Sequence, residues 1–147
     1  MNAASALIDG AKGGAIATVA MSAVMIAGER SGLMGEQPPT TVTRFALGAA
    51  GVDRPSPPAT LLSPVMHLAF GALGGGVFGV VRRLAPSVHG EVLGVCFGLA
   101  VWAVSYKGWI PALGILPAPE DDRPGRPIVM VLAHVVYGFV LGRLVRP

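Results

Sequence analysis

PSPPATLLSPVMHLAFGALGGGVFGVV, residues 55–81, contains no Asp, Glu, Lys or Arg. This apolar run of 27 residues lies between Arg54 and Arg82, and it exceeds the roughly 18 uncharged residues that are typical of a helix crossing a lipid bilayer. Charged residues make up 13% of the 147 residues, against about 25% in soluble domains, and the mean hydropathy is +0.64. We therefore expect an integral membrane protein rather than a soluble helical bundle.

The chain has three further uncharged runs, which are shorter: residues 13–28, 92–106 and 127–142. Each becomes long enough to span a bilayer if Lys12, Lys107 or Arg143 lies at its edge and extends its charge toward water. The sequence thus predicts a single transmembrane domain with four spanning helices. These helices cover about residues 6–28, 63–84, 90–109 and 127–145 of the domain, which comprises residues 1–147.

The loop at 29–60 contains the stretch PPTTVTRFALGAAG, residues 38–51. Prolines at its start and a glycine at its end are typical of a helix with defined boundaries. We expect a short helix there, outside the membrane. The predicted fold class is all-α: an integral membrane four-helix bundle with a short extramembrane helix in its first loop.

The distribution of basic residues predicts the orientation. Four spans place both chain termini on one side, which carries five basic residues on short segments, whereas the six on the other side are spread over two longer, proline-rich loops. Because basic residues in short loops stay in the cytoplasm, we expect both termini to be cytoplasmic. The formal net charge of +3 favours the lipid bilayer as a partner over nucleic acid.

An internal repeat relates the two halves of the chain. A shift of 67 residues superimposes His67, Phe70, Gly71 and Gly75 on His134, Tyr137, Gly138 and Gly142. A shift of 80 residues superimposes Gly10 and Gly14 on Gly90 and Gly94. These matches predict two tandem helix pairs, residues 1–84 and 85–147, inserted in the same orientation. The second and fourth helices would then face each other across the symmetry axis.

Small residues in these repeats indicate close helix packing. Positions i, i+4 and i+8 share one face of a helix, and small residues on such a face let two backbones approach closely. The predicted helix-packing residues are Gly14, Gly71, Gly75, Gly94, Gly138 and Gly142. At the end of the third helix, Tyr106 and Trp109 are predicted to lie at the membrane–water interface.

The two repeated histidines are the candidate site, because polar groups inside a bilayer tend to be functional. One interpretation is packing: a neutral imidazole hydrogen-bonded to Ser105, Tyr106 or a free carbonyl. A second is a b-type haem ligated by His67 and His134, with the glycines making room for the macrocycle. A third is a proton or small-solute site formed by the same pair, to which Tyr137 would contribute from the second half alone, since its repeat partner is Phe70.

The remaining polar and reactive side chains are weaker candidates for a functional site. The sequence EDDR at 120–123 is expected to be solvated, and Cys96 is expected to be a small core residue. No cluster of acid–base or nucleophilic residues has the setting that catalysis needs. We therefore expect neither an enzyme nor a metal site.

Three stretches carry a family resemblance: GGAIATVAMS at 13–22, YKGWIPALGILPAP at 106–119 and HVVYGFVLG at 134–142. They resemble the YagU-like families of small bacterial inner-membrane proteins of unknown function. The resemblance implies a multi-pass protein of the bacterial inner membrane, and it carries no catalytic residues.

Together these observations predict a structural or accessory membrane protein without a cofactor, which forms a homodimer or joins a larger membrane complex through its small-residue faces. The alternative is a haem-binding or a proton- or small-solute-handling protein that uses His67 and His134. A tightly packed interior would favour the structural role, and a water-filled cavity reaching both histidines would favour transport.

Overall fold

The computed structural model describes residues 2–52 and 57–147. Its helical segments follow in chain order: α1 (Ala3–Arg30), α2 (Pro38–Ala49), α3 (Pro57–Leu84), α4 (Gly90–Val104), the π-helical turn η1 (Ser105–Trp109), α5 (Ile110–Ala112) and α6 (Arg126–Leu144). No strand occurs in this part of the chain. The predicted all-α four-helix bundle, with the short helix α2 in its first loop, is confirmed.

Four helices are long and apolar enough to cross a membrane: Ala3–Arg30, Leu61–Leu84, Gly90–Ala112 and Arg126–Leu144. They agree with the four predicted spans except at some ends. The second helix begins at Pro57 and not near residue 63, so Pro64 lies inside α3. Pro64 therefore lies about two turns into the helix, past the first turn in which proline costs no backbone hydrogen bond.

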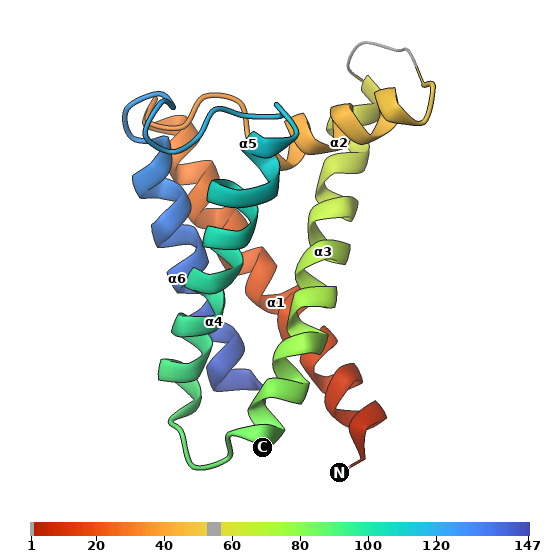
Figure 1. Cartoon of the computed structure of the whole chain (residues 1–147), viewed down its shortest axis with the longest axis vertical. Coiled ribbons are helices and arrows are strands. Elements are labelled where there is room, and N and C mark those ends of the chain that lie inside the picture. The colour runs from red at the N-terminus through yellow and green to blue at the C-terminus, as the bar shows by residue number, and fades with distance from the viewer. Residues whose placement is uncertain (1, 53–56) are drawn as a thin grey trace.

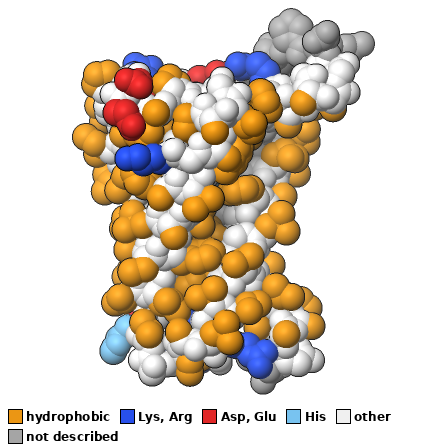
Figure 2. Space-filling model, in the orientation of Figure 1, with side chains coloured by type: hydrophobic (Ala, Val, Ile, Leu, Met, Phe, Trp, Pro, Cys, Tyr) orange, Lys and Arg blue, Asp and Glu red, His pale blue; other side chains and the backbone are white. Residues whose placement is uncertain are grey.

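The four long helices alternate in direction, so both termini lie at the same end of the bundle as the α3–α4 loop (Figure 1). Helix α2 and the loop before α6 cover the opposite end. Hydrophobic side chains cover the middle of the face seen in Figure 2, and charged ones gather at its two ends. Large apolar side chains such as Val19, Leu73 and Val104 are 61%, 72% and 68% exposed, as expected of a surface that contacts lipid.

Glycines join the helices into two pairs. In the first pair, a Cβ on Gly14 of α1 would overlap the carbonyl oxygen of Gly71 on α3, and a Cβ on Gly75 would overlap α1 in turn. The second pair repeats this arrangement with the residues that the shifts of 80 and 67 make equivalent: Gly94 of α4 packs against Gly138 and Gly142 of α6. The predicted helix-packing glycines thus lie at backbone contacts within the pairs.

The two pairs are not joined symmetrically. On one side α1 packs along α6, with Gly28 against Val129 and Gly13 against Val145. On the other side, α3 and α4 diverge from the loop that connects them (Figure 1). We call the gap between them the open seam. The expected face-to-face packing of the second and fourth helices does not occur, because α1 is the helix that lies along α6.

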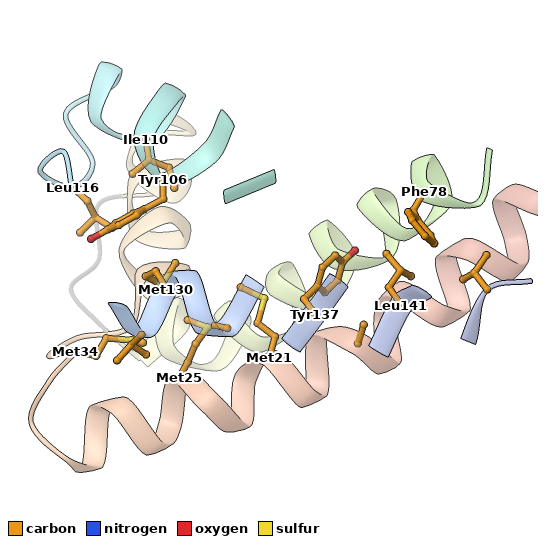
Figure 3. Packing of buried hydrophobic residues seen from close by; sticks show 14 residues of the cluster. Met21, Met25, Met34, Phe78, Tyr106, Ile110, Leu116, Met130, Tyr137 and Leu141 are labelled. Atoms are coloured by element: carbon orange, nitrogen blue, oxygen red, sulfur yellow. The ribbon is translucent and has the colours of Figure 1, made fainter. Parts of the chain in front are cut away.

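Aromatic side chains bridge the open seam at two levels. Phe78 of α3 and Phe97 of α4 have ring centroids 5.3 Å apart. Further from the α3–α4 loop, Phe70 and Trp109 have ring centroids 6.5 Å apart. Figure 3 shows the buried ring of Phe78 pointing from α3 into the bundle. The seam therefore has aromatic contacts near the connecting loop and again near the π-helical turn.

Candidate functional site

A cavity of about 160 Å³ lies in the open seam. Its walls come from both helix pairs and from α2, and they bring together the three predicted site residues His67, His134 and Tyr137. The two histidines are far apart in sequence but belong to one space, which no pattern in a single helix reveals. Their role as a ligand or proton site stays a prediction.

His134 is almost completely buried in the cavity wall, with 5% of its surface exposed. Its Nδ1 atom lies 2.8 Å from the carbonyl oxygen of Met130, one turn earlier in α6. A carbonyl can only accept, so Nδ1 carries the hydrogen and, in the neutral ring, Nε2 is a free acceptor. Of the partners that the packing interpretation named (Ser105, Tyr106 or a free carbonyl), the hydrogen bond thus goes to a carbonyl, and this carbonyl belongs to the same helix.

His67 occupies a more open position on α3. Its Nδ1 lies 3.3 Å from the hydroxyl oxygen of Ser22 on α1, so this contact joins the two helices of the first pair. The ring lines the cavity on one side and a polar groove on the other. The groove contains Glu29 and Glu36 and runs toward the end of the bundle that α2 covers.

Glu36 in this groove is paired with Arg44 of α2. The hydrogen bond from the Arg44 guanidinium holds the pKa of the Glu36 carboxyl below its ordinary value, with Thr41 adding a weaker one. The second carboxylate, Glu29, accepts a hydrogen bond of 2.6 Å from the side chain of Gln37. The groove is therefore lined by charged and polar groups, unlike the cavity.

Tyr137 closes the deep side of the cavity and ties the two pairs together. Its hydroxyl donates a hydrogen bond of 2.7 Å to the carbonyl oxygen of Gly71 on α3. The side chain is 3% exposed, and Figure 3 shows it reaching from α6 toward α3. The residue that the shift of 67 matches with Tyr137 is Phe70, which has no hydroxyl to donate in the other direction.

Most of the cavity surface is apolar and much of it is methionine. Met21 and Met25 of α1, Met66 of α3 and Met130 of α6 all line it. Figure 3 shows Met21, Met25 and Met130 lying near one another in the interior. Methionine has three rotatable bonds and a polarisable sulfur, so such a wall adapts to apolar molecules of different shapes.

The glycines do not provide the space that the haem interpretation requires. A Cβ on Gly75 would overlap the α1 backbone at Gly10 and Gly14, and one on Gly142 would overlap the α4 backbone at Gly90. The cavity of 160 Å³ is close to an engineered cavity of about 150 Å³ that holds one benzene molecule. A porphyrin therefore does not fit between α3 and α6 in the described arrangement.

Tyr106, predicted at the membrane–water interface, lies inside the protein, and its depth in the membrane stays a prediction. It is completely buried, and its hydroxyl donates a hydrogen bond of 2.6 Å to Asp122 in the loop before α6. The π-helical turn that contains Tyr106 also contains Trp109, which is partly buried and lines the cavity. The extra residue of such a turn re-aims side chains, and here one side chain faces the loop and another faces the cavity.

Asp122 was expected to be solvated, and this expectation is wrong. Its side chain is 2% exposed and pairs with Arg126, with Nη1 to Oδ1 2.8 Å apart. Arg126 in turn donates a hydrogen bond of 2.9 Å to the carbonyl oxygen of Met34. The network joins both loops at this end of the bundle. The i, i+4 spacing of Asp122 and Arg126 was the feature of the sequence that could have indicated this ion pair.

Cys96 of α4 was expected to be a core residue. It is exposed instead.

A comparison with known protein families shows the family to which this chain belongs. The model of a family of unknown function, DUF6789, matches residues 4–146. The chain belongs to this family. No curated protein and no solved structure matches the chain. Membership of DUF6789 agrees with the expected unknown function, and the resemblance to YagU-like proteins stays a prediction.

Across residues 2–52 and 57–147, no three His, Cys, Asp or Glu side chains are grouped to hold a metal ion.

Proposed function

We propose that this DUF6789 protein binds a small, largely apolar molecule inside the membrane, in the cavity of the open seam. The observation that carries the proposal is that both helix pairs contribute to one cavity that contains His67 and His134. Such a space is not expected in a purely structural bundle. A cavity of 160 Å³ deprives the side chains of its wall of packing contacts, which an occupant would supply.

The position of the cavity supports entry from the bilayer. Met66 and Phe70 on the α3 side are 46% and 50% exposed, and both also line the cavity. A molecule dissolved among the lipid chains can therefore enter between α3 and α4 without crossing water. The methionine wall accepts such a molecule without demanding one shape.

The other predicted roles have less support. The cavity has no Asp or Glu among its described lining residues. The acids Glu29 and Glu36 lie in the groove on the other side of His67, where they are bonded to Gln37 and Arg44, so neither carboxylate is free to pass a proton into the cavity. A homodimer or larger complex would have to use other surfaces, because the glycine faces pack inside the bundle. We propose binding rather than catalysis, in a bacterial inner membrane with cytoplasmic termini, on the basis of the charge distribution and the YagU-like stretches.

Thermal unfolding of the detergent-solubilised protein tests this proposal with toluene as the probe. A molecule that binds only the folded state raises the Tm, so toluene is expected to raise it by several degrees. Val101→Phe fills the cavity from α4 and is expected to abolish this increase. The matched control is Val104→Phe on the same helix, because Val104 is 68% exposed to the lipid side.

The two variants separate binding in the cavity from an effect of toluene on the micelle. If toluene raises the Tm of wild type and Val104→Phe but not of Val101→Phe, the cavity is the binding site. An equal change in all three proteins, or no change in any, contradicts the proposal.

A further inference from the structure

The polar side chains deep in the cavity use their hydrogens within the protein. Each hydroxyl donates to a backbone carbonyl oxygen: Thr18 to Gly14 at 2.7 Å, Thr43 to Pro39 at 2.7 Å, Ser105 to Val101 at 2.6 Å and Tyr137 to Gly71 at 2.7 Å. All four donors are buried residues that line the cavity. What these groups still offer to an occupant is therefore lone pairs.

His134 adds the strongest of these acceptors. Its Nδ1 hydrogen is used on Met130, and no hydrogen bond among the described residues involves its Nε2. The ring is 95% buried, since 5% of its surface is exposed. Without a partner among the described residues, Nε2 has most to gain from a donor on the occupant.

The donor that Nε2 takes must be uncharged. An ammonium group also donates, but burying a cation requires a nearby anion. The described residues that line the cavity include neither Asp nor Glu. His67 and Trp109, whose ring N–H groups can donate, are only partly buried. A neutral hydroxyl is the common apolar-compatible group that satisfies these conditions.

The size of the cavity limits the rest of the molecule. Its 160 Å³ matches a space known to hold a single benzene ring, at about 150 Å³. A ring or short branched chain with one hydroxyl therefore fills it.

We infer that the occupant is a small neutral alcohol or phenol whose hydroxyl donates to Nε2 of His134. This inference rests on the proposed function, because it requires the cavity to bind a molecule at all. It predicts discrimination between aromatic molecules of similar size. Phenol donates, whereas its methyl ether anisole and its apolar analogue toluene do not.

Titration calorimetry of the solubilised protein with phenol, anisole and toluene tests the inference, with protein-free micelles as the blank. Phenol is expected to bind about tenfold more tightly than anisole, the usual gain from one hydrogen bond to a buried partner. In His134→Asn, the side-chain amide can still donate to the Met130 carbonyl, but the Nε2 acceptor is gone. The preference for phenol over toluene is expected to fall about tenfold in this variant.

The outcomes distinguish the two proposals. Failure of all three compounds to bind overturns the proposed function and this inference with it. Binding of toluene with an equal affinity for phenol and anisole overturns this inference alone. An unchanged phenol preference in His134→Asn does the same. If His134→Asn does not fold, the comparison of phenol with anisole on the wild-type protein still decides, because it needs no variant.

Discussion

Tyr137 on α6 donates a hydrogen bond to the carbonyl oxygen of Gly71 on α3, from one helix pair to the other. The position equivalent to Tyr137 in the first pair is Phe70, which instead packs against Trp109. The two halves are thus joined by a polar contact in one direction and an aromatic contact in the other. The cavity lies between the two halves on the side where α3 and α4 diverge.

Replacing Tyr137 by Phe removes the hydroxyl and keeps the ring. The Gly71 carbonyl then loses its cross-helix donor, so we expect the free energy of unfolding to fall by about 1 kcal/mol. Unfolding in mixed detergent–SDS micelles measures it. Leu132→Ala on the same helix, at a side chain 53% exposed, is the control and should change stability less. Equal stability of Tyr137→Phe and wild type would show that this hydrogen bond does not hold the pairs together.

The ion pair of Asp122 and Arg126 fixes the loops at the α2 end of the bundle. Asp122→Ala leaves the guanidinium buried without its anion, and breaking a buried pair in this way typically costs about 3 kcal/mol or more. We expect a loss of this size in the free energy of unfolding. Asp121→Ala, at the exposed neighbouring position, is the matched control. Similar effects of the two substitutions would contradict the burial of Asp122.

Close packing of α4 on α6 depends on the absence of a side chain at Gly94. A methyl group there would overlap the Gly138 carbonyl, and the helices must separate to admit it. We expect Gly94→Ala to destabilise by about 1–3 kcal/mol. Gly48→Ala on α2, where a Cβ meets no atom within 4 Å, should instead stabilise by up to about 1 kcal/mol. If Gly94→Ala leaves the free energy of unfolding unchanged, α4 and α6 pack less closely than the structure shows.

The pair of Glu36 and Arg44 predicts a pH dependence outside the membrane. Because the Arg44 hydrogen bond lowers the pKa of Glu36 in the folded state, its contribution is complete above the unfolded-state pKa. It disappears as the pH falls through the lower folded-state pKa. We expect Glu36→Gln to be less stable than wild type at pH 7, and the difference to vanish in strong acid. A stability difference that persists in strong acid would show that the effect of Glu36→Gln comes from packing and not from charge. Both side chains are about half exposed, so added salt should reduce it.

Local patterns in the sequence were sufficient for the helices and their pairing. The uncharged run before Arg82 predicted α3, and the spacing of Gly71 and Gly75 predicted a face that packs closely on another helix. These features depend on residues within one or two turns of each other, where the geometry of a helix leaves little freedom.

Long-range contacts explain what the sequence did not predict. The packing of α1 along α6 and the divergence of α3 and α4 involve contacts between helices that are far apart in the sequence, and no single stretch contains them. Tyr106 and Asp122 each looked suited to water or to an interface. Their burial follows from a hydrogen bond between residues in different elements, which a pattern within one helix does not contain.

Methionine methyl NMR with toluene tests the central claim, that an apolar molecule binds in the open seam, most directly. Four of the six methionines line the cavity: Met21, Met25, Met66 and Met130. Met34 is as buried as Met25 but lies outside the cavity. Ring-current shifts confined to the four cavity methyls, and lost in Val101→Phe, are the predicted result. Shifts that include Met34, or that survive Val101→Phe, would contradict the account.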